Sequence, residues 1–200
     1  VAVFDPVQLE GTTVTRASVH NVSILKELRL GIGDEIKVYK ANMIIPQIAE
    51  NLTKSGTVQI PEKCPACGGR TAIHQAQDVQ TLFCENPNCP AKKIKSFTQF
   101  VSRDAINIDG LSEMTLEKLI GRGLIHSFGD LFRLRQHRDV IVSMDGFGEK
   151  SCDKLDESIE KARITTLPRL LFALGVPGIG VANAKGISRA FGDDLEQLRN

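Results

Sequence analysis

The sequence has no tryptophan, one tyrosine and nine phenylalanines among its 200 residues. Single-stranded nucleic acids are usually held by aromatic side chains on which the bases stack, so a base-stacking platform is poorly supplied here. There is also no apolar run near the ~18 residues of a membrane span, and nothing resembles a signal peptide. We therefore expect no membrane association and a cytosolic setting.

A strong net charge is absent too, because 25 Lys and Arg residues oppose 24 Asp and Glu residues, giving +1. No global basic field draws the molecule to nucleic acid. Locally the balance differs, since the range 63–103 holds six basic and two acidic residues, a net of +4. Such a patch favours a polyanion, although a solvated basic surface is the alternative. The six basic residues are Lys63, Arg70, Lys92, Lys93, Lys95 and Arg103.

Cysteines are few, but four of the five form two pairs, Cys64/Cys67 and Cys84/Cys89. A disulfide, a redox couple and a metal site compete for them. With 42% hydrophobic residues the chain can bury cores without disulfides, and cytosolic thiols stay reduced. A redox pair needs a CxxC at a helix start in a βαβ pattern, which is missing. The spacing C-x2-C, sixteen residues and C-x4-C is typical of a four-cysteine zinc site.

Four protein ligands leave no open coordination position, so we expect a structural zinc. His74 lies between the pairs and could replace one cysteine, but a solvent-facing strand suits it better. Cys152 has no partner in sequence and falls on the apolar stripe of a predicted helix, as a small core residue.

The fold class expected is multidomain α+β, divided at 1–62, 63–92 and 93–200. The first segment carries strand-like runs at 14–19 and 35–52, with helical spacing at 21–30. These fit a small OB-type β-barrel, while an SH3-like barrel or a swapped-in sheet fragment remains open. The second segment is the four-cysteine zinc finger.

The third segment is predicted to be all-α and repeated. Gly110, Gly146 and Gly178 are 36 and 32 residues apart, each in a short turn before a helical pattern. One such turn is usually an ordinary connection, but three in phase favour a helix-hairpin-helix array. Glycines permit positive φ and close approach, so amides at the next helix start can hold a DNA phosphate. The residues expected to bind DNA are Gly110, Gly146, Gly148, Lys150, Gly178, Gly180, Lys185, Arg16, Lys92, Lys93 and Lys95.

The order of barrel, zinc turn and hairpin array resembles the middle and C-terminal part of bacterial NAD-dependent DNA ligases. Nearly the whole chain contributes to this resemblance. The segments that carry it are GTTVTRASVHN, GDEIKVYKANMIIPQI, CPACGG, FVSRDAINIDGL, GFGEKS and LFALGVPGIG.

The resemblance implies an enzyme that seals nicks in duplex DNA during replication and repair, in the bacterial cytoplasm. Lysine adenylation by NAD, transfer of AMP to the 5′-phosphate and attack by the 3′-hydroxyl are its three steps. In this family the barrel lies in the minor groove near the nick, the hairpins hold phosphates and the zinc turn fixes the angle between them. NAD and magnesium would serve the full-length enzyme and not this segment, which is expected to be monomeric.

The sequence departs from the family pattern at three places. Asn42 and Met43 stand where many members have a Gly-Asp pair, so they receive no role, and Ser112 replaces the second glycine of the first hairpin. The adenylated lysine belongs to a K-x-D-G motif, and the nearest match, 143–146, begins with a serine. We therefore expect no adenylation by this chain.

The chain opens without methionine and closes on DDLEQLRN, which resembles the first helix of a further repeat. It is therefore expected to be a fragment of a longer ligase. The alternatives are a non-enzymatic helix-hairpin-helix DNA-binding protein or a repair-nuclease module, and more remotely an RNA-binding protein with a zinc ribbon. Neither of the first two explains the barrel and zinc segments in this order.

Overall fold

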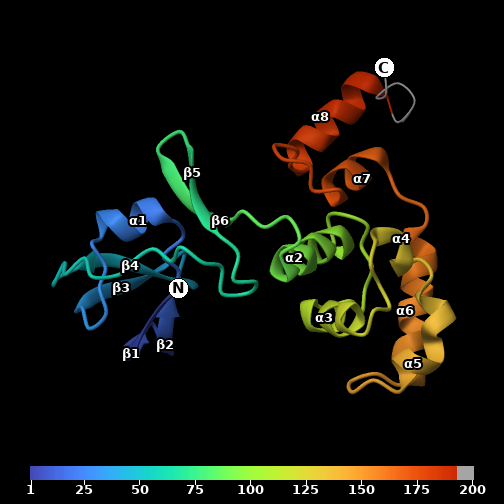
Figure 1. Ribbon diagram of the computed structural model, residues 1–200, viewed down its shortest axis with the longest axis horizontal. Coiled ribbons are helices and arrows are strands. Elements are labelled where there is room, and N and C mark those ends of the chain that lie inside the picture. The colour runs from blue at the N-terminus through green and yellow to red at the C-terminus, as the bar shows by residue number, and fades with distance from the viewer. Residues whose placement is uncertain (193–200) are drawn as a thin grey trace. The chain divides into compact units, whose positions relative to one another are not determined.

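The computed structural model describes residues 1–192, as two compact units, Val1–Cys89 and Pro90–Asn200 (Figure 1). The first unit holds strands and one short helix, and the second is built from helices. The helix expected over 193–200 lies outside the described residues. The division at 62 and 92 stays a prediction, and each unit is described by itself.

Two antiparallel hairpins form the first part of unit 1. Strand β1 (Ala2–Leu9) pairs with β2 (Thr12–Ala17), and β3 (Ile36–Ala41) pairs with β4 (Ile45–Asn51). A single parallel bridge, Ser18 to Gln47, links the two hairpins. The strands predicted from β-branched runs are confirmed, although within residues 1–192 they pair as separate two-stranded sheets and not as one closed ladder.

A short helix, α1 (Val22–Glu27), connects these hairpins and is capped at both ends. The Asn21 side chain accepts from the amide of Ile24 at 2.9 Å. At the other end, the fully buried Asn51 side chain donates to the carbonyls of Leu28 and Arg29, at 3.0 Å each. Such caps satisfy backbone groups that a helix end leaves unpaired. Asn51 therefore ties the end of β4 to the end of α1.

The cysteine-bearing hairpin consists of β5 (Thr71–Ala76) and β6 (Val79–Cys84) and docks on α1. The Ser23 hydroxyl accepts from the amide of Gln80 at 2.8 Å and donates to the carbonyl of Asp78 at 3.2 Å. The Lys26 ammonium donates to the Gln80 side chain at 2.8 Å. These bonds join residues more than fifty positions apart and hold the hairpin within unit 1.

Unit 2 is helical, as predicted from its apolar periodicity. Its elements are α2 (Pro90–Val101), α3 (Glu113–Gly121), α4 (Phe128–Leu131), the 3-10 helix η1 (Leu134–His137), α5 (Arg138–Val142), α6 (Glu149–Ala162), α7 (Leu167–Ala173) and α8 (Val181–Phe191). No helix in residues 1–192 is both long enough and apolar enough to cross a membrane.

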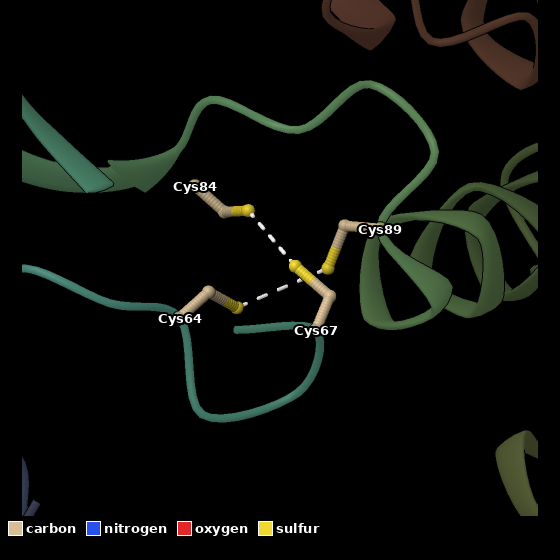
Figure 2. Close-up of side chains that lie close together, drawn as sticks. All are labelled: Cys64, Cys67, Cys84 and Cys89. Carbon is tan, nitrogen blue, oxygen red and sulfur yellow. Dashed lines mark hydrogen bonds between the residues drawn. The ribbon is translucent and has the colours of Figure 1, made fainter. Parts of the chain in front are cut away.

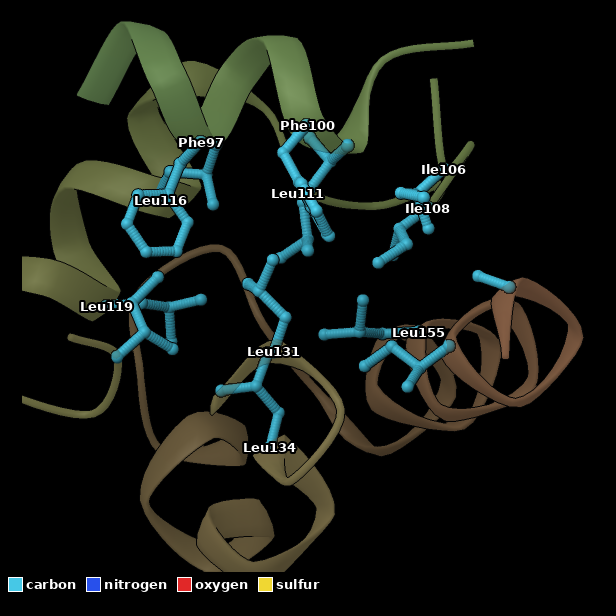
Figure 3. Packing of buried hydrophobic residues seen from close by; sticks show 14 of the residues in the cluster. Phe97, Phe100, Ile106, Ile108, Leu111, Leu116, Leu119, Leu131, Leu134 and Leu155 are labelled. Atoms are coloured by element: carbon cyan, nitrogen blue, oxygen red, sulfur yellow. The ribbon is translucent and has the colours of Figure 1, made fainter. Parts of the chain in front are cut away.

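One apolar core holds the unit together, and Figure 3 shows its leucines meeting two phenylalanines of α2. The Phe100 ring stacks on Phe128, with centroids 4.2 Å apart and planes 8° from parallel. Leu116, Leu119 and Leu131 are completely buried between the helices. Cys152 is also buried in this core, where the stripe of α6 places it. The packing fixes the turns that precede α3 and α6.

Candidate metal centre and nucleic-acid interface

Four cysteine sulfurs converge in unit 1, as Figure 2 shows. All four Sγ atoms lie within 4.8 Å of one another, and all four thiols are free. Cys64 lies 3.9 Å from Cys89, and Cys67 lies 3.5 Å from Cys84, measured between sulfurs. Each close contact thus joins one member of the first pair to one member of the second, as a single shared site requires.

The distances suit a tetrahedral metal and exclude a disulfide. Four sulfurs placed about 2.3 Å from a central ion lie about 3.8 Å from one another, whereas a disulfide needs about 2.05 Å. The two sulfur–sulfur distances, 3.9 and 3.5 Å, lie on either side of the tetrahedral value. His74 stays outside the group, on β5, where its ring lies 5.0 Å from that of Phe83. The residues present therefore fit a four-thiolate metal site.

The first pair is presented by a tight glycine turn. The Gly68 amide donates to the carbonyl of Cys64 at 2.8 Å, and the Cys64 amide donates to the carbonyl of Gly69 at 2.7 Å. Gly68 has φ of +68°, a left-handed conformation that favours glycine. A Cβ at Gly69 would lie 3.2 Å from the Cys67 sulfur. Both glycines therefore let the turn close around its sulfurs.

The second pair is presented by an asparagine turn, in which the Asn86 side chain accepts from the amide of Asn88 at 2.9 Å. Hydrogen bonding from the Asn86 side chain, followed by the Gly69 amide, lowers the pKa of Cys67 to about 6. Burial raises the pKa of Cys84 to about 12. Donors aimed at a sulfur also stabilise a metal-bound thiolate. Cysteine spacing alone gave no sign that Asn86 or Gly69 contacts a sulfur, although both residues stand in recognisable turns.

Three glycine turns precede α3, α6 and α8 in unit 2. Their first glycines, Gly110, Gly146 and Gly178, have φ of +89°, +86° and +81°. The shared left-handed conformation confirms that the three turns are alike in backbone. The second glycines differ from expectation, since Gly148 has φ of −160° and Gly180 has φ of −81°. Positive φ, which the sequence pattern suggested for the turn glycines, is therefore wrong for these two, because each is an N-cap with an extended backbone.

The first helix start is already occupied by its own side chains. The Ser112 hydroxyl accepts from the amide of Thr115 at 3.2 Å, which satisfies one of the free donors of α3. Glu113 places a negative charge in the same turn, where the Lys95 ammonium pairs with it at 2.8 Å. The start of α3 is therefore a poor anion-binding site, and Glu113 partly neutralises the charge of Lys95.

The second helix start is open on the side of its N-cap. Gly148 has no side chain, and an added Cβ would meet nothing within 4 Å. Its own amide donates to the Ser151 hydroxyl at 2.8 Å. The negative charge of Glu149 is engaged by Arg138 at 2.6 Å. A surface cavity at this helix start is lined by Gly148, Glu149, Lys150, Ser151 and Lys154.

The third helix start has the fewest groups of the three that would obstruct or repel an anion. Gly180 is the N-cap, a Cβ added there would meet nothing within 4 Å, and the first turn of α8 has no acidic residue. The Asn183 side chain donates to the carbonyl of Gly178 at 2.7 Å and so fixes the turn. Lys185 is exposed on the same helix.

The remaining basic candidates lie in both units. Arg16 is exposed on β2 of unit 1. On α2 of unit 2, Lys92 and Lys95 are exposed and Lys93 is half-buried. The structure therefore gathers three of these cations on one helix.

Comparison with known proteins matches the first part of the chain to a domain family and the whole chain to longer relatives. Residues 1–59 match the family model of the NAD-dependent DNA ligase OB-fold domain. The DNA ligase of Lachnoclostridium phytofermentans is 57% identical over 200 residues, which are 100% of this chain and 31% of that protein. Residues 1–59 therefore belong to the NAD-dependent DNA ligase OB-fold family, and the whole chain is similar to part of a DNA ligase. The resemblance carried by the sequence segments is thereby confirmed.

Two further DNA ligases give the same picture. That of Ruminiclostridium cellulolyticum is 58% identical over 100% of this chain and 30% of its own length. That of Limosilactobacillus reuteri is 44% identical over 96% of this chain and 28% of its own length. The chain thus spans about a third of the length of these relatives, and it holds a part of the ligase that lacks the adenylation lysine.

Proposed function

We propose that this chain is the part of an NAD-dependent DNA ligase that grips duplex DNA through the second and third glycine turns. The observation that supports this most is the state of the helix starts. Gly148 and Gly180 leave open space before α6 and α8, whereas Ser112 closes the start of α3. The three turns form a helix-hairpin-helix array in this proposal.

The chemistry at these starts is that of an anion site. The first amides of a helix have no partner within the helix, and the helix dipole adds partial positive charge. A phosphate oxygen can approach them closely only where no side chain intervenes. Lys150 and Lys185 then add charge without reading bases, so the binding carries little sequence preference. Lys92, Lys93, Lys95 and Arg16 are proposed as further phosphate contacts.

We propose zinc as the ion held by Cys64, Cys67, Cys84 and Cys89, because four thiolates select a soft tetrahedral metal. When bound, the ion would cross-link the two cysteine turns and would leave no coordination position open for catalysis. The protein's own residues do the remaining work. Ser23 and Lys26 hold the cysteine hairpin on α1, and the asparagine and glycine turns aim the sulfurs.

For the whole protein we propose nick sealing with NAD and magnesium, in replication and repair, by a monomeric enzyme of the bacterial cytoplasm. NAD dependence follows from the family, and DNA is the substrate that the name of the relatives implies. The steps of adenylation are assigned to residues beyond this chain, since the serine at 143 replaces the motif lysine.

The test is a titration of the zinc-loaded chain with fluorescent nicked duplex, intact duplex and single-stranded DNA over a range of salt concentrations. We expect both duplexes to bind more tightly than the single strand. The logarithm of the binding constant should fall linearly with that of salt concentration, as counterion release requires. Tighter binding to the single strand, or no binding to duplex at low salt, would overturn the proposal.

A further inference from the structure

Two of the glycine turns are braced by each other's helices (Figure 1 locates α3 and α6). The Lys118 ammonium, on α3, donates to the carbonyl of Asp145 at 2.8 Å and lies 3.6 Å from the carboxylate of Asp145. Asp145 directly precedes Gly146 in the second turn. Lys118, on the helix that follows the first turn, therefore holds the Asp145 carbonyl in place where the second turn begins.

The reciprocal bond runs from α6 to the first turn. The Ser158 hydroxyl is buried and accepts from the amide of Asp109 at 2.7 Å. Asp109 directly precedes Gly110, just as Asp145 precedes Gly146. Leu155, one turn earlier on α6, lies 3.7 Å from the position that a Cβ on Gly110 would take. Each turn is thus held at its Asp-Gly step by the helix that follows the other turn.

The third turn is braced differently. Its carbonyl at Gly178 accepts from Asn183, which belongs to α8, the helix that this same turn begins. The third turn therefore needs no side chain from α3 or α6 for this bond. The first and second turns are therefore each held by the other's helix, whereas the third turn is held by its own helix.

We propose that Lys118 is a positioning residue for phosphate binding at the second turn, and that the first turn acts as its support and not as a second DNA contact. This inference rests on the proposed function of the second turn. Holding the Asp145 carbonyl sets the direction of the turn at Gly146 and therefore the direction of the first amides of α6. Lys118 is itself occupied by that carbonyl and by the Asp145 carboxylate, so it acts through the turn.

The experiment is a double-mutant cycle on duplex binding by the full zinc-loaded chain. Lys118→Met removes the donor, and Lys118→Arg retains one. Lys161→Met removes an equal charge from the exposed last turn of α6 and serves as the matched control. Gly148→Val and Gly180→Val each block one helix start.

We expect Lys118→Met to weaken binding about fivefold, the order of one lost hydrogen bond. Lys118→Arg should restore most of the affinity, and Lys161→Met should change it less than twofold. In the Gly148→Val background, Lys118→Met should cause almost no further loss of affinity. In the Gly180→Val background it should cause its full loss of affinity. The reason is that mutations at coupled sites are non-additive, whereas mutations at independent sites add.

Equal effects of Lys118→Met in both glycine backgrounds, with the salt slope reduced by about 0.9, would show a direct phosphate contact and overturn the positioning role.

A second measurement needs no DNA. Hydrogen exchange at Phe147, whose amide bonds to the carbonyl of Met144 at 2.9 Å, should quicken in Lys118→Met and not in Lys161→Met. Unchanged exchange would also overturn the brace. If the wild-type chain failed to bind duplex at all, the proposed function would fail, and exchange at Phe147 would still decide on the brace.

Discussion

Ser112, Gly148 and Gly180 occupy the same position, immediately before a helix, and differ in what they leave for a ligand. The Ser112 hydroxyl accepts a hydrogen bond from the amide of Thr115, whereas the two glycines leave open space in front of α6 and α8. The glycine pattern in the sequence located these positions correctly. It could not show which glycine has positive φ, because that depends on where the following helix begins.

At the residue scale, the four cysteines give the first prediction. We expect one zinc per chain, with four sulfurs about 2.3 Å from the metal in X-ray absorption. Cys67→Ser should lower the zinc content and loosen unit 1, because a hydroxyl is a far weaker ligand than a thiolate. Elemental analysis of the purified variants measures the content directly.

Cys152→Ser is the matched control for the zinc prediction. Cys152 lies in the core of unit 2 and outside the group of four converging sulfurs, so it is not a ligand. This variant should keep its zinc even if unit 2 loses stability. A full complement of zinc in Cys67→Ser, or a disulfide among the four cysteines, would contradict the assignment.

At the scale of elements, the turn between β3 and β4 gives the second prediction. Asn42 and Met43 are the two central residues of a tight turn closed by a bond from the Ile44 amide to the Ala41 carbonyl, with φ of +51° and +61°. Both positions are left-handed, which suits asparagine and glycine but not methionine. We expect Met43→Gly to stabilise this hairpin by about 0.5–1 kcal/mol. Slower hydrogen exchange at Ile44 would report the gain.

Met43→Ala separates backbone relief from loss of the side chain. It removes nearly the same exposed side chain but keeps a Cβ at positive φ, so it should give no gain. Equal protection in the alanine and glycine variants would show that the exposed side chain, and not the backbone, carries the cost.

The start of α4 gives a prediction about pH. The amides of His126 and Ser127 donate to the Asp130 carboxylate at 2.9 and 2.8 Å and hold the pKa of that carboxyl well below its usual 3.8. Folding thus favours the ionised form, and this contribution to stability is present above pH 3.8 and is lost as pH falls through the lower folded pKa. We expect Asp130→Asn to be less stable than wild type near neutral pH.

That difference should shrink as the pH falls. Urea unfolding followed by circular dichroism near neutral pH and at about pH 3 compares the two proteins. A difference that stays constant across this range would mean that the charge of Asp130 does not contribute.

Local patterns in the sequence predicted the elements better than their contacts. Helical spacing located α3, α6 and α8, and cysteine spacing located the sulfur cluster, because both patterns are set by neighbours in the chain. The bonds from the Gln80 amide to Ser23 and from Lys118 to Asp145 join distant segments. A lone serine or lysine on a helix carries no local signal for such a bond. The pairing of the strands into separate hairpins was not predicted for the same reason.

At the scale of the whole molecule, the chain is expected to bind DNA without starting the reaction. Incubation with NAD labelled in its adenylate should leave no label on the protein, because 143–146 lacks the lysine nucleophile. Mass spectrometry after gel filtration measures this. Covalent AMP on Lys150 or Lys118, the lysines beside that Asp-Gly step, would mean that the site had been misread.

The most direct test of DNA binding at the second and third turns is the duplex affinity of the double variant Gly148→Val, Gly180→Val. A Cβ added at either position meets nothing within 4 Å in the free protein, so we expect zinc content and helical circular dichroism not to change. We expect duplex binding to weaken by roughly tenfold or more, about 1.4 kcal/mol per factor of ten, while Ser112→Ala has a much smaller effect. Unchanged affinity in the folded double variant, or an equal loss in Ser112→Ala, would contradict phosphate capture at these two helix starts.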